Sequence, residues 1–288
     1  MSDLKGIFKA VAYGKIDKVK KYIEAGVDIN EGDKEGYTPL HWAVQEGYVD
    51  LVKYLIEKGA DLNKRDDDGF FPLEIACTKG HFEIVKLLVE NNCDLKLARG
   101  DYIPLHSAAA TGRYDIVKFL VENGMDVNKE DNGGYTPIHC ATQEGHLEVI
   151  KLLVELGGNL EVKDEDGFSP MYIAASFGFK DIVEYIIGKK VNIDIENIYN
   201  VTPLIIASTY NHFDVVELLL KNKANIEAEN NNGSTALFDA VLYGNTQIVK
   251  ILLKYGANTN VKDNEGKSLD DIVNPEKKEI LKLLRIEK

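Results

Sequence analysis

The sequence contains little proline and little cysteine. Seven prolines among 288 residues, with 44% hydrophobic residues, exclude a disordered chain, because enough apolar side chains are present to build a core. The three cysteines are Cys77, Cys93 and Cys140. Because their number is odd and no Cys-x-x-Cys pair occurs, neither a disulfide framework nor a zinc site is expected, and a reducing compartment fits best.

Long apolar runs and an excess of basic residues are also missing. No stretch is long enough to cross a bilayer, and the N-terminal "MSDLKGIFKAVAYGKIDKVKK" carries charges too early and too often for a signal peptide. The net charge of −13 would repel nucleic acids and anionic membranes. These features predict a cytoplasmic protein with no nucleic-acid or membrane partner. A nuclear location, or delivery into a host if the source is a host-associated microbe, are the alternatives.

Catalytic motifs are absent as well. The sequence has no His-Glu-x-x-His, Gly-x-Ser-x-Gly or Gly-x-Gly-x-x-Gly motif. The stretch "EGKS" (Glu265 to Ser268) resembles the end of a phosphate-binding loop, but the earlier glycine that such a loop needs is Val261. We therefore expect no enzyme activity, no bound metal and no cofactor.

What the sequence does have is an internal repeat. Six prolines follow one another at steps of 33, 32, 33, 33 and 33 residues: Pro39, Pro72, Pro104, Pro137, Pro170 and Pro203. Further steps reach Ala236 and Leu269, and counting backward reaches Gly6, so about nine units cover the chain.

Each unit predicts two short helices. A turn rich in Asp, Asn and Gly precedes a Thr-Pro or Ser-Pro pair, which suits the first turn of a helix. Alanine recurs within this helix and glycine ends it, which indicates close helix approach and a left-handed terminus. A second segment, such as "EIVKLLVE", has its apolar residues on one helical face. No unit can bury that face alone, so the units must stack; the predicted fold is an all-α repeat solenoid, an elongated monomer.

The repeated motif resembles that of the ankyrin repeat family. Thr38-Pro39-Leu40-His41 is a complete Thr-Pro-Leu-His hallmark, and His106 and His139 occupy the same position in later units, where Tyr172, Ile205 and Phe238 then replace histidine. The resemblance implies a curved stack of helix-turn-helix ankyrin units with β-hairpin or loop fingers, whose tips and first helices line a concave face. It also implies that the histidine and threonine hydrogen-bond within the turn. All six histidines are then structural.

The predicted domain organisation follows from the repeat. We expect one ankyrin-repeat domain over 1–288, with an N-terminal cap at 1–32, internal repeats at 33–263 and a C-terminal cap at 264–288, which would form a complete array. The unit before Pro104 is one residue short and has Asp101 where other units have glycine. This deletion predicts a distorted finger at 98–103.

In this family the framework repeats and the binding positions vary. Two residues before the proline, five successive units carry an aromatic residue: Tyr37, Phe70, Tyr102, Tyr135 and Phe168. Just before the residue that ends the first helix, the later units carry Phe177, Tyr210 and Tyr243. Trp42, Gln45, Glu46, Gln143 and Glu144 complete the candidate partner-binding residues. The finger aromatics fit inter-finger packing as well as a binding surface, and Trp42 fits the core better than the surface.

The main functional prediction is a noncatalytic scaffold or adaptor that binds a protein or extended peptide with apolar anchors and some basic residues. One alternative is a small-ligand or nucleotide sensor. Another is a substrate or inhibitor of a modifying enzyme, since the resemblance implies asparagine hydroxylation at the positions of Asn30, Asn63, Asn128 and Asn260.

Overall fold

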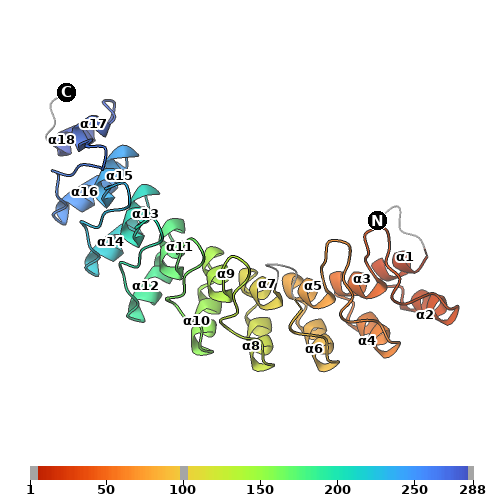
Figure 1. Ribbon diagram of the computed structural model, residues 1–288. Coiled ribbons are helices and arrows are strands. Elements are labelled where there is room, and N and C mark those ends of the chain that lie inside the picture. Colours follow the sequence, from red (N-terminus) through yellow and green to blue (C-terminus); the bar gives the residue numbers. More distant parts are fainter. Residues whose placement is uncertain (1–5, 98–102, 285–288) are drawn as a thin grey trace. The chain divides into compact units, whose positions relative to one another are not determined.

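The computed structural model describes residues 6–97 and 103–284, where the chain forms 18 helices and no β-strand (Figure 1). The predicted distortion at 98–103 and the candidate residue Tyr102 lie outside these ranges, apart from Ile103. The helices are α1 (Gly6–Ala12), α2 (Ile16–Glu24), α3 (Pro39–Gln45), α4 (Val49–Glu57), α5 (Pro72–Lys79), α6 (Phe82–Glu90), α7 (Pro104–Ala110), α8 (Tyr114–Glu122), α9 (Pro137–Gln143), α10 (Leu147–Glu155), α11 (Pro170–Phe177), α12 (Lys180–Gly188), α13 (Pro203–Thr209), α14 (Phe213–Lys221), α15 (Ala236–Leu242), α16 (Thr246–Lys254), α17 (Leu269–Ile272) and α18 (Lys278–Leu283).

Most first helices begin and end as the repeat predicts, whereas α5 and α7 follow Phe71 and Ile103 and have no side-chain cap. Ser169, for example, caps α11 by accepting a hydrogen bond from the Tyr172 N–H at 3.2 Å, and Pro170 takes the first helical position, where no N–H is needed. Gly178 ends the same helix with a φ of +76°, which a residue with a β-carbon rarely adopts.

Two features of each repeat pack neighbouring helix pairs together: an alanine in the first helix and an apolar face on the second helix. The alanines that recur in the first helices are fully buried, which lets adjacent first helices approach closely: Ala43, Ala76, Ala108, Ala141, Ala174, Ala207 and Ala240. In the second helix α6, Ile84, Val85 and Leu88 are fully buried while Glu83 and Glu90 face solvent. Burial of each such side chain stabilises the stack by about 1.5–3 kcal/mol.

The chain divides into two compact units. Unit 1 holds Met1–Asn132 and Lys151–Gly157, and unit 2 holds Gly133–Ile150 and Gly158–Lys288. In unit 1, α1, α3, α5 and α7 contact one another in order; in unit 2, α9, α11, α13, α15 and α17 do the same. Within unit 2 these first helices lie on one side, and α12, α14 and α16 on the other (Figure 1).

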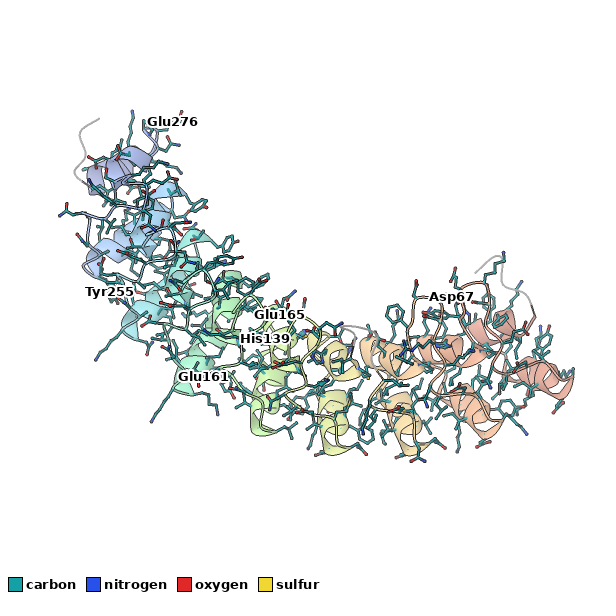
Figure 2. All side chains as sticks on the ribbon, viewed as in Figure 1. Asp67, His139, Glu161, Glu165, Tyr255 and Glu276 are labelled. Atoms are coloured by element: carbon teal, nitrogen blue, oxygen red, sulfur yellow. The ribbon has the colours of Figure 1, made fainter. Side chains whose placement is uncertain are left out.

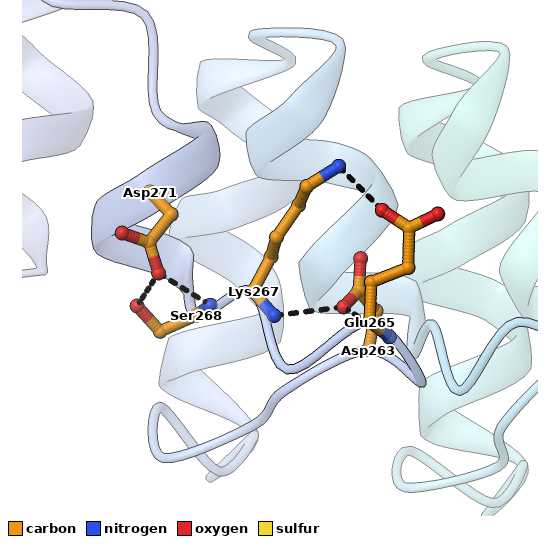
Figure 3. A network of polar contacts seen from close by, with 5 residues as sticks. All are labelled: Asp263, Glu265, Lys267, Ser268 and Asp271. Carbon is orange, nitrogen blue, oxygen red and sulfur yellow. Dashed lines mark hydrogen bonds and ion pairs between the residues drawn. The ribbon is translucent and has the colours of Figure 1, made fainter.

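The fingers that join consecutive pairs are tight loops held by an Asp or Asn side chain. In the last finger, Asp263 Oδ1 accepts hydrogen bonds from the N–H groups of Glu265 and Lys267, at 3.0 and 2.8 Å (Figure 3). Lys267 pairs with Glu265, and Asp271 accepts hydrogen bonds from the Ser268 N–H and hydroxyl. The "EGKS" stretch is therefore a finger that leads into the N-cap of α17, and it does not precede a phosphate-binding helix.

Adjacent fingers are joined by single backbone hydrogen bonds. Ile198 N–H donates to the Asp166 carbonyl at 3.2 Å, and Asn231 N–H donates to the Tyr199 carbonyl at 2.9 Å. One bond per finger is too little for a strand ladder, so the fingers of the described residues are loops rather than paired strands, with one isolated bridge between Lys262 and Ser268.

Candidate binding surface

The fingers and first helices of each unit make up one surface, which we call the finger face. In unit 2, leaving out the last finger and α17, it consists of residues 133–144, 163–177, 196–210 and 229–243. In unit 1, α3 and α5 with their fingers contribute residues 32–46 and 65–79. Glu165, on a finger, and Glu161, beyond a second helix, lie on opposite sides of unit 2 (Figure 2). The helices of the described residues are all too short and polar to cross a membrane. The same residues contain no His, Cys, Asp and Glu group arranged to hold a metal ion.

The motif histidines join one repeat to the next. His41 Nδ1 lies 3.1 Å from the Thr38 backbone nitrogen, and its Nε2 lies 3.2 Å from the Phe70 carbonyl oxygen in the following finger. Because a backbone N–H only donates and a carbonyl only accepts, His41 is neutral with its proton on Nε2. Burial lowers the pKa of His41, which agrees with this state. His139 repeats the arrangement with Thr136 and Phe168. The predicted threonine–histidine hydrogen bond is confirmed at both positions.

In unit 1 the candidate residues Tyr37 and Trp42 form one cluster. Their ring centroids are 5.6 Å apart, edge to face, and the Trp42 indole N–H donates to Asp33 at 2.8 Å. Both rings are half-buried. Burial, and then the charges of Asp66 and nearby carboxylates, raise the pKa of Tyr37. Trp42 is therefore fixed at the base of a finger, with part of its ring facing solvent.

The other unit 1 candidates lie along the same face. Phe70 is half-buried, and its N–H donates to Asp66 at 2.7 Å. Gln45 and Glu46 are also half-buried, and the Gln45 carbonyl lies 3.3 Å from His81 Nε2 of the next repeat. The backbone at Gln45 therefore takes part in the contact between one repeat and the next.

Unit 2 has a pocket on its finger face. Its volume is about 280 Å³, and eight residues line it: Tyr135, Gln143, Phe168, Tyr172, Ile173, Ser176, Phe177 and Tyr210. Five of them are candidates from the sequence. Tyr172, Ile173 and Ser176 are additional. Tyr172 occupies the motif histidine position, four residues after Phe168. An aromatic residue at that position is the sequence feature that could have indicated its place in the pocket.

The pocket has a fixed inner wall and an open outer edge. Phe168 and Tyr172 stack with their ring centroids 4.7 Å apart and their planes 2° from parallel. Burial, the nearby Tyr210 hydroxyl and Asp164 raise the pKa of Tyr172 to about 12, so it stays a neutral hydroxyl. Phe177 and Tyr210 form the edge, where they are 53% and 60% exposed. The outer edge of the pocket is thus formed by two large rings that are mostly open to solvent.

Two other predicted residues lie outside this pocket. Glu144 follows Gln143 and is exposed. Tyr243 has the same repeat position as Phe177 and Tyr210 and is also 60% exposed, but it does not line the pocket. Tyr243 is therefore a matched control for Phe177 and Tyr210, which line the pocket.

A buried carboxylate lies one repeat further along. Asp239 of α15 is buried, and its Oδ2 lies 2.9 Å from the hydroxyl of Thr209, the residue next to Tyr210. Burial raises the pKa of Asp239, and the hydrogen bond from Thr209 partly opposes that rise.

The asparagines considered for modification link repeats or face solvent. Asn30 Oδ1 accepts a hydrogen bond from the Asp61 N–H, and Asn63 Oδ1 accepts one from the Asp94 N–H, both at 2.8 Å. Asn128 donates to the Gly157 carbonyl at 3.0 Å, and Asn260 is exposed.

Stacked helix pairs joined by loop fingers define an all-α repeat solenoid. A family described as "Ankyrin repeats (3 copies)" matches residues 7–99, 98–164 and 171–263, and one described as "Ankyrin repeats (many copies)" matches residues 144–187. Together these segments cover most of the sequence. The chain belongs to the ankyrin repeat family, whose members generally act as protein-interaction modules.

Similar proteins agree with this assignment. The crystal structure of the human ASB11 ankyrin repeat domain matches with a TM-score of 0.69 and 29% identity, over 74% of this chain and 98% of that one. Acyl-CoA-binding domain-containing protein 4 of Oryza sativa subsp. japonica is 49% identical over 43 residues, which are 15% of this chain. The matched segment spans only 13% of the length of that curated relative.

Proposed function

We propose that this chain is a noncatalytic binding module that holds a segment of a partner protein on its finger face. The observation that carries the proposal is the unit 2 pocket, where Phe177 and Tyr210 expose more than half of their surface beside a stacked aromatic wall. Large rings around a small pocket are typical of the anchor points at which protein interfaces concentrate their binding energy.

A cytoplasmic monomer is part of the same proposal. None of the three cysteines forms a disulfide, and Cys77 and Cys93 are buried. Burial raises the pKa of the Cys93 thiol to about 11, so this thiol is unreactive at neutral pH. A reducing compartment is consistent with such cysteines.

The test compares capture of a partner from the native source by three forms of the protein. Wild type and Tyr255→Ala should recover the same partner, because Tyr255 lies on the second-helix side, beyond α16 (Figure 2). Phe177→Ala combined with Tyr210→Ala should lose it. Equal recovery by all three forms would contradict binding on the finger face.

A nucleotide sensor is disfavoured by charge. In unit 2 the finger face carries five exposed carboxylates and one lysine, Lys163, whose ammonium donates to the Glu196 carbonyl at 2.6 Å. Phosphates would be repelled by such a surface. We expect no thermal shift with ATP or GTP, and a saturable shift at micromolar nucleotide would transfer the proposal to ligand sensing.

A further inference from the structure

The negative charge of unit 2 is concentrated on the finger face. Its four segments hold seven acidic residues against Lys163: Glu144, Asp164, Glu165, Asp166, Glu196, Glu229 and Asp239. The segments of unit 2 between these stretches hold eight acidic residues and seven lysines. They are residues 145–150, 158–162, 178–195, 211–228 and 244–261. The acidity is therefore a property of one face rather than of the whole unit, and it attracts a basic partner.

The pocket offers aromatic rings within this acidic face. Phe177 and Tyr210 are exposed at its edge, and the stacked pair of Phe168 and Tyr172 forms its wall. The face of an aromatic ring carries partial negative charge, so a cation placed over it is attracted. A planar guanidinium can also stack flat on such a ring, which an ammonium cannot do.

Hydrogen-bond acceptors are available in the same pocket. The Ser176 hydroxyl donates its proton to the Ile173 carbonyl at 2.9 Å, so its oxygen can only accept from a ligand. Gln143 and the tyrosines that line the pocket also carry oxygens able to accept hydrogen bonds. A guanidinium, with five N–H donors and no acceptor, is complementary to this set.

Other occupants use less of what the pocket provides. An aliphatic or aromatic anchor would contact the rings, but it would use neither the hydrogen-bond acceptors nor the negative charge of this face. Lysine would satisfy the charge, but its compact ammonium is more strongly hydrated and loses more on entering a cavity of about 280 Å³ lined by rings.

We propose that the unit 2 pocket binds an arginine side chain from an extended, basic segment of a partner protein, with the guanidinium stacked against Phe177 and Tyr210. This inference rests on the proposed binding function and adds the identity of the anchor. Glu144, exposed next to the pocket-lining Gln143, steers the basic residues that flank the arginine.

The experiment is selection from a random library of extended decapeptides displayed on phage, with the full chain immobilised. Wild type should enrich arginine at one position at least tenfold over its input frequency. Phe177→Ala combined with Tyr210→Ala should lose this enrichment, whereas Tyr243→Ala, which removes an equally exposed ring outside the pocket, should keep it. Thermal melts of each variant establish that all three are folded.

A synthetic peptide from the selected set then separates charge from shape. Replacing its arginine with citrulline, a neutral side chain of almost the same shape, should weaken binding at least tenfold to wild type and less than twofold to Phe177→Ala/Tyr210→Ala. Selection of apolar residues in place of arginine, or equal binding of the citrulline peptide, would overturn the arginine assignment but leave the binding module standing. Arginine enrichment that persists in the double variant would also overturn it. Enrichment of no residue at all would sink both proposals.

Discussion

The hydroxyl of Thr209 lies 2.9 Å from a carboxylate oxygen of Asp239 and 2.9 Å from the carbonyl oxygen of Ile205. A hydroxyl has one proton, so an ionised Asp239 and the carbonyl compete for it. A protonated Asp239 can instead donate to the Thr209 hydroxyl, which then donates to the Ile205 carbonyl. Each of these three oxygens then takes part in a hydrogen bond with one clear donor. This geometry and the burial of Asp239 both favour its neutral form, in line with its raised pKa.

Asp239→Asn should therefore raise the free energy of unfolding at pH 7. Because the pKa of Asp239 is higher in the folded than in the unfolded state, the folded protein binds this proton more tightly. Its contribution to stability then falls as pH rises from the unfolded-state pKa through the folded-state pKa. The asparagine amide can donate to Thr209 at any pH. Urea unfolding should show the gain at pH 7 shrinking toward pH 4. Glu229→Gln, an exposed acid of the same face, should show no such trend, and a variant less stable than wild type at pH 7 would contradict the assignment.

His41 should produce the opposite slope near neutrality. Its pKa is lowered by burial, so the unfolded chain binds the proton more tightly, and stability falls as pH drops below the unfolded value of about 6.5. His41→Leu should remove this part of the pH dependence of unfolding between pH 7.5 and 5. It should also cost about 2 kcal/mol at pH 7.5, because the Thr38 N–H and the Phe70 carbonyl lose their partner. An unchanged slope in the variant would show that His41 does not titrate in this range.

Much of the framework could be predicted from the sequence because it depends on local chemistry repeated many times. The proline, the alanine and the helix-ending glycine each have one physical reason to be where they are, and the structure confirms them at positions such as Pro170, Ala174 and Gly178. The sequence left two shapes open for the fingers, β-hairpin and loop. Their single linking hydrogen bonds depend on how two adjacent loops meet, which composition does not specify.

The pocket was only partly predictable for the same reason. Phe177 and Tyr210 vary between units, so they stood out against the framework. Tyr172 did not, since it replaces a motif histidine, yet its ring stacks on Phe168 and lines the pocket. The contact between Thr209 and Asp239 joins residues 30 positions apart, and neither side chain belongs to the repeat motif.

Glycine substitutions should separate backbone strain from inter-finger packing. Gly167 has a φ of +77°, and a β-carbon there would lie 2.8 Å from the Ile198 nitrogen of the next finger. Gly256 has a φ of +89° with nothing within 4 Å of an added β-carbon. Alanine at either position costs about 1–2 kcal/mol for the left-handed conformation. Gly167→Ala should cost roughly 1–3 kcal/mol more, because a backbone has to move. If Gly167→Ala and Gly256→Ala lower the free energy of unfolding equally in chemical denaturation, the fingers can move apart without an energetic cost.

The last prediction separates packing from binding among the aromatic residues of unit 2. Tyr135 and Phe168 are half-buried and contact His139 and Tyr172, with ring centroids 5.2 and 4.7 Å apart. Tyr135→Ala combined with Phe168→Ala should lower the free energy of unfolding by roughly 1–3 kcal/mol, since these rings pack on the motif residues. Phe177→Ala combined with Tyr210→Ala removes rings that are mostly exposed, and should cost under about 1 kcal/mol.

Both double variants should weaken binding of the selected peptide by about 2 kcal/mol or more. The measurements are a urea melt and a peptide titration on each variant. Unchanged stability of the Tyr135 and Phe168 variant would assign those rings to the binding surface alone, and unchanged affinity with lost stability would assign them to the scaffold.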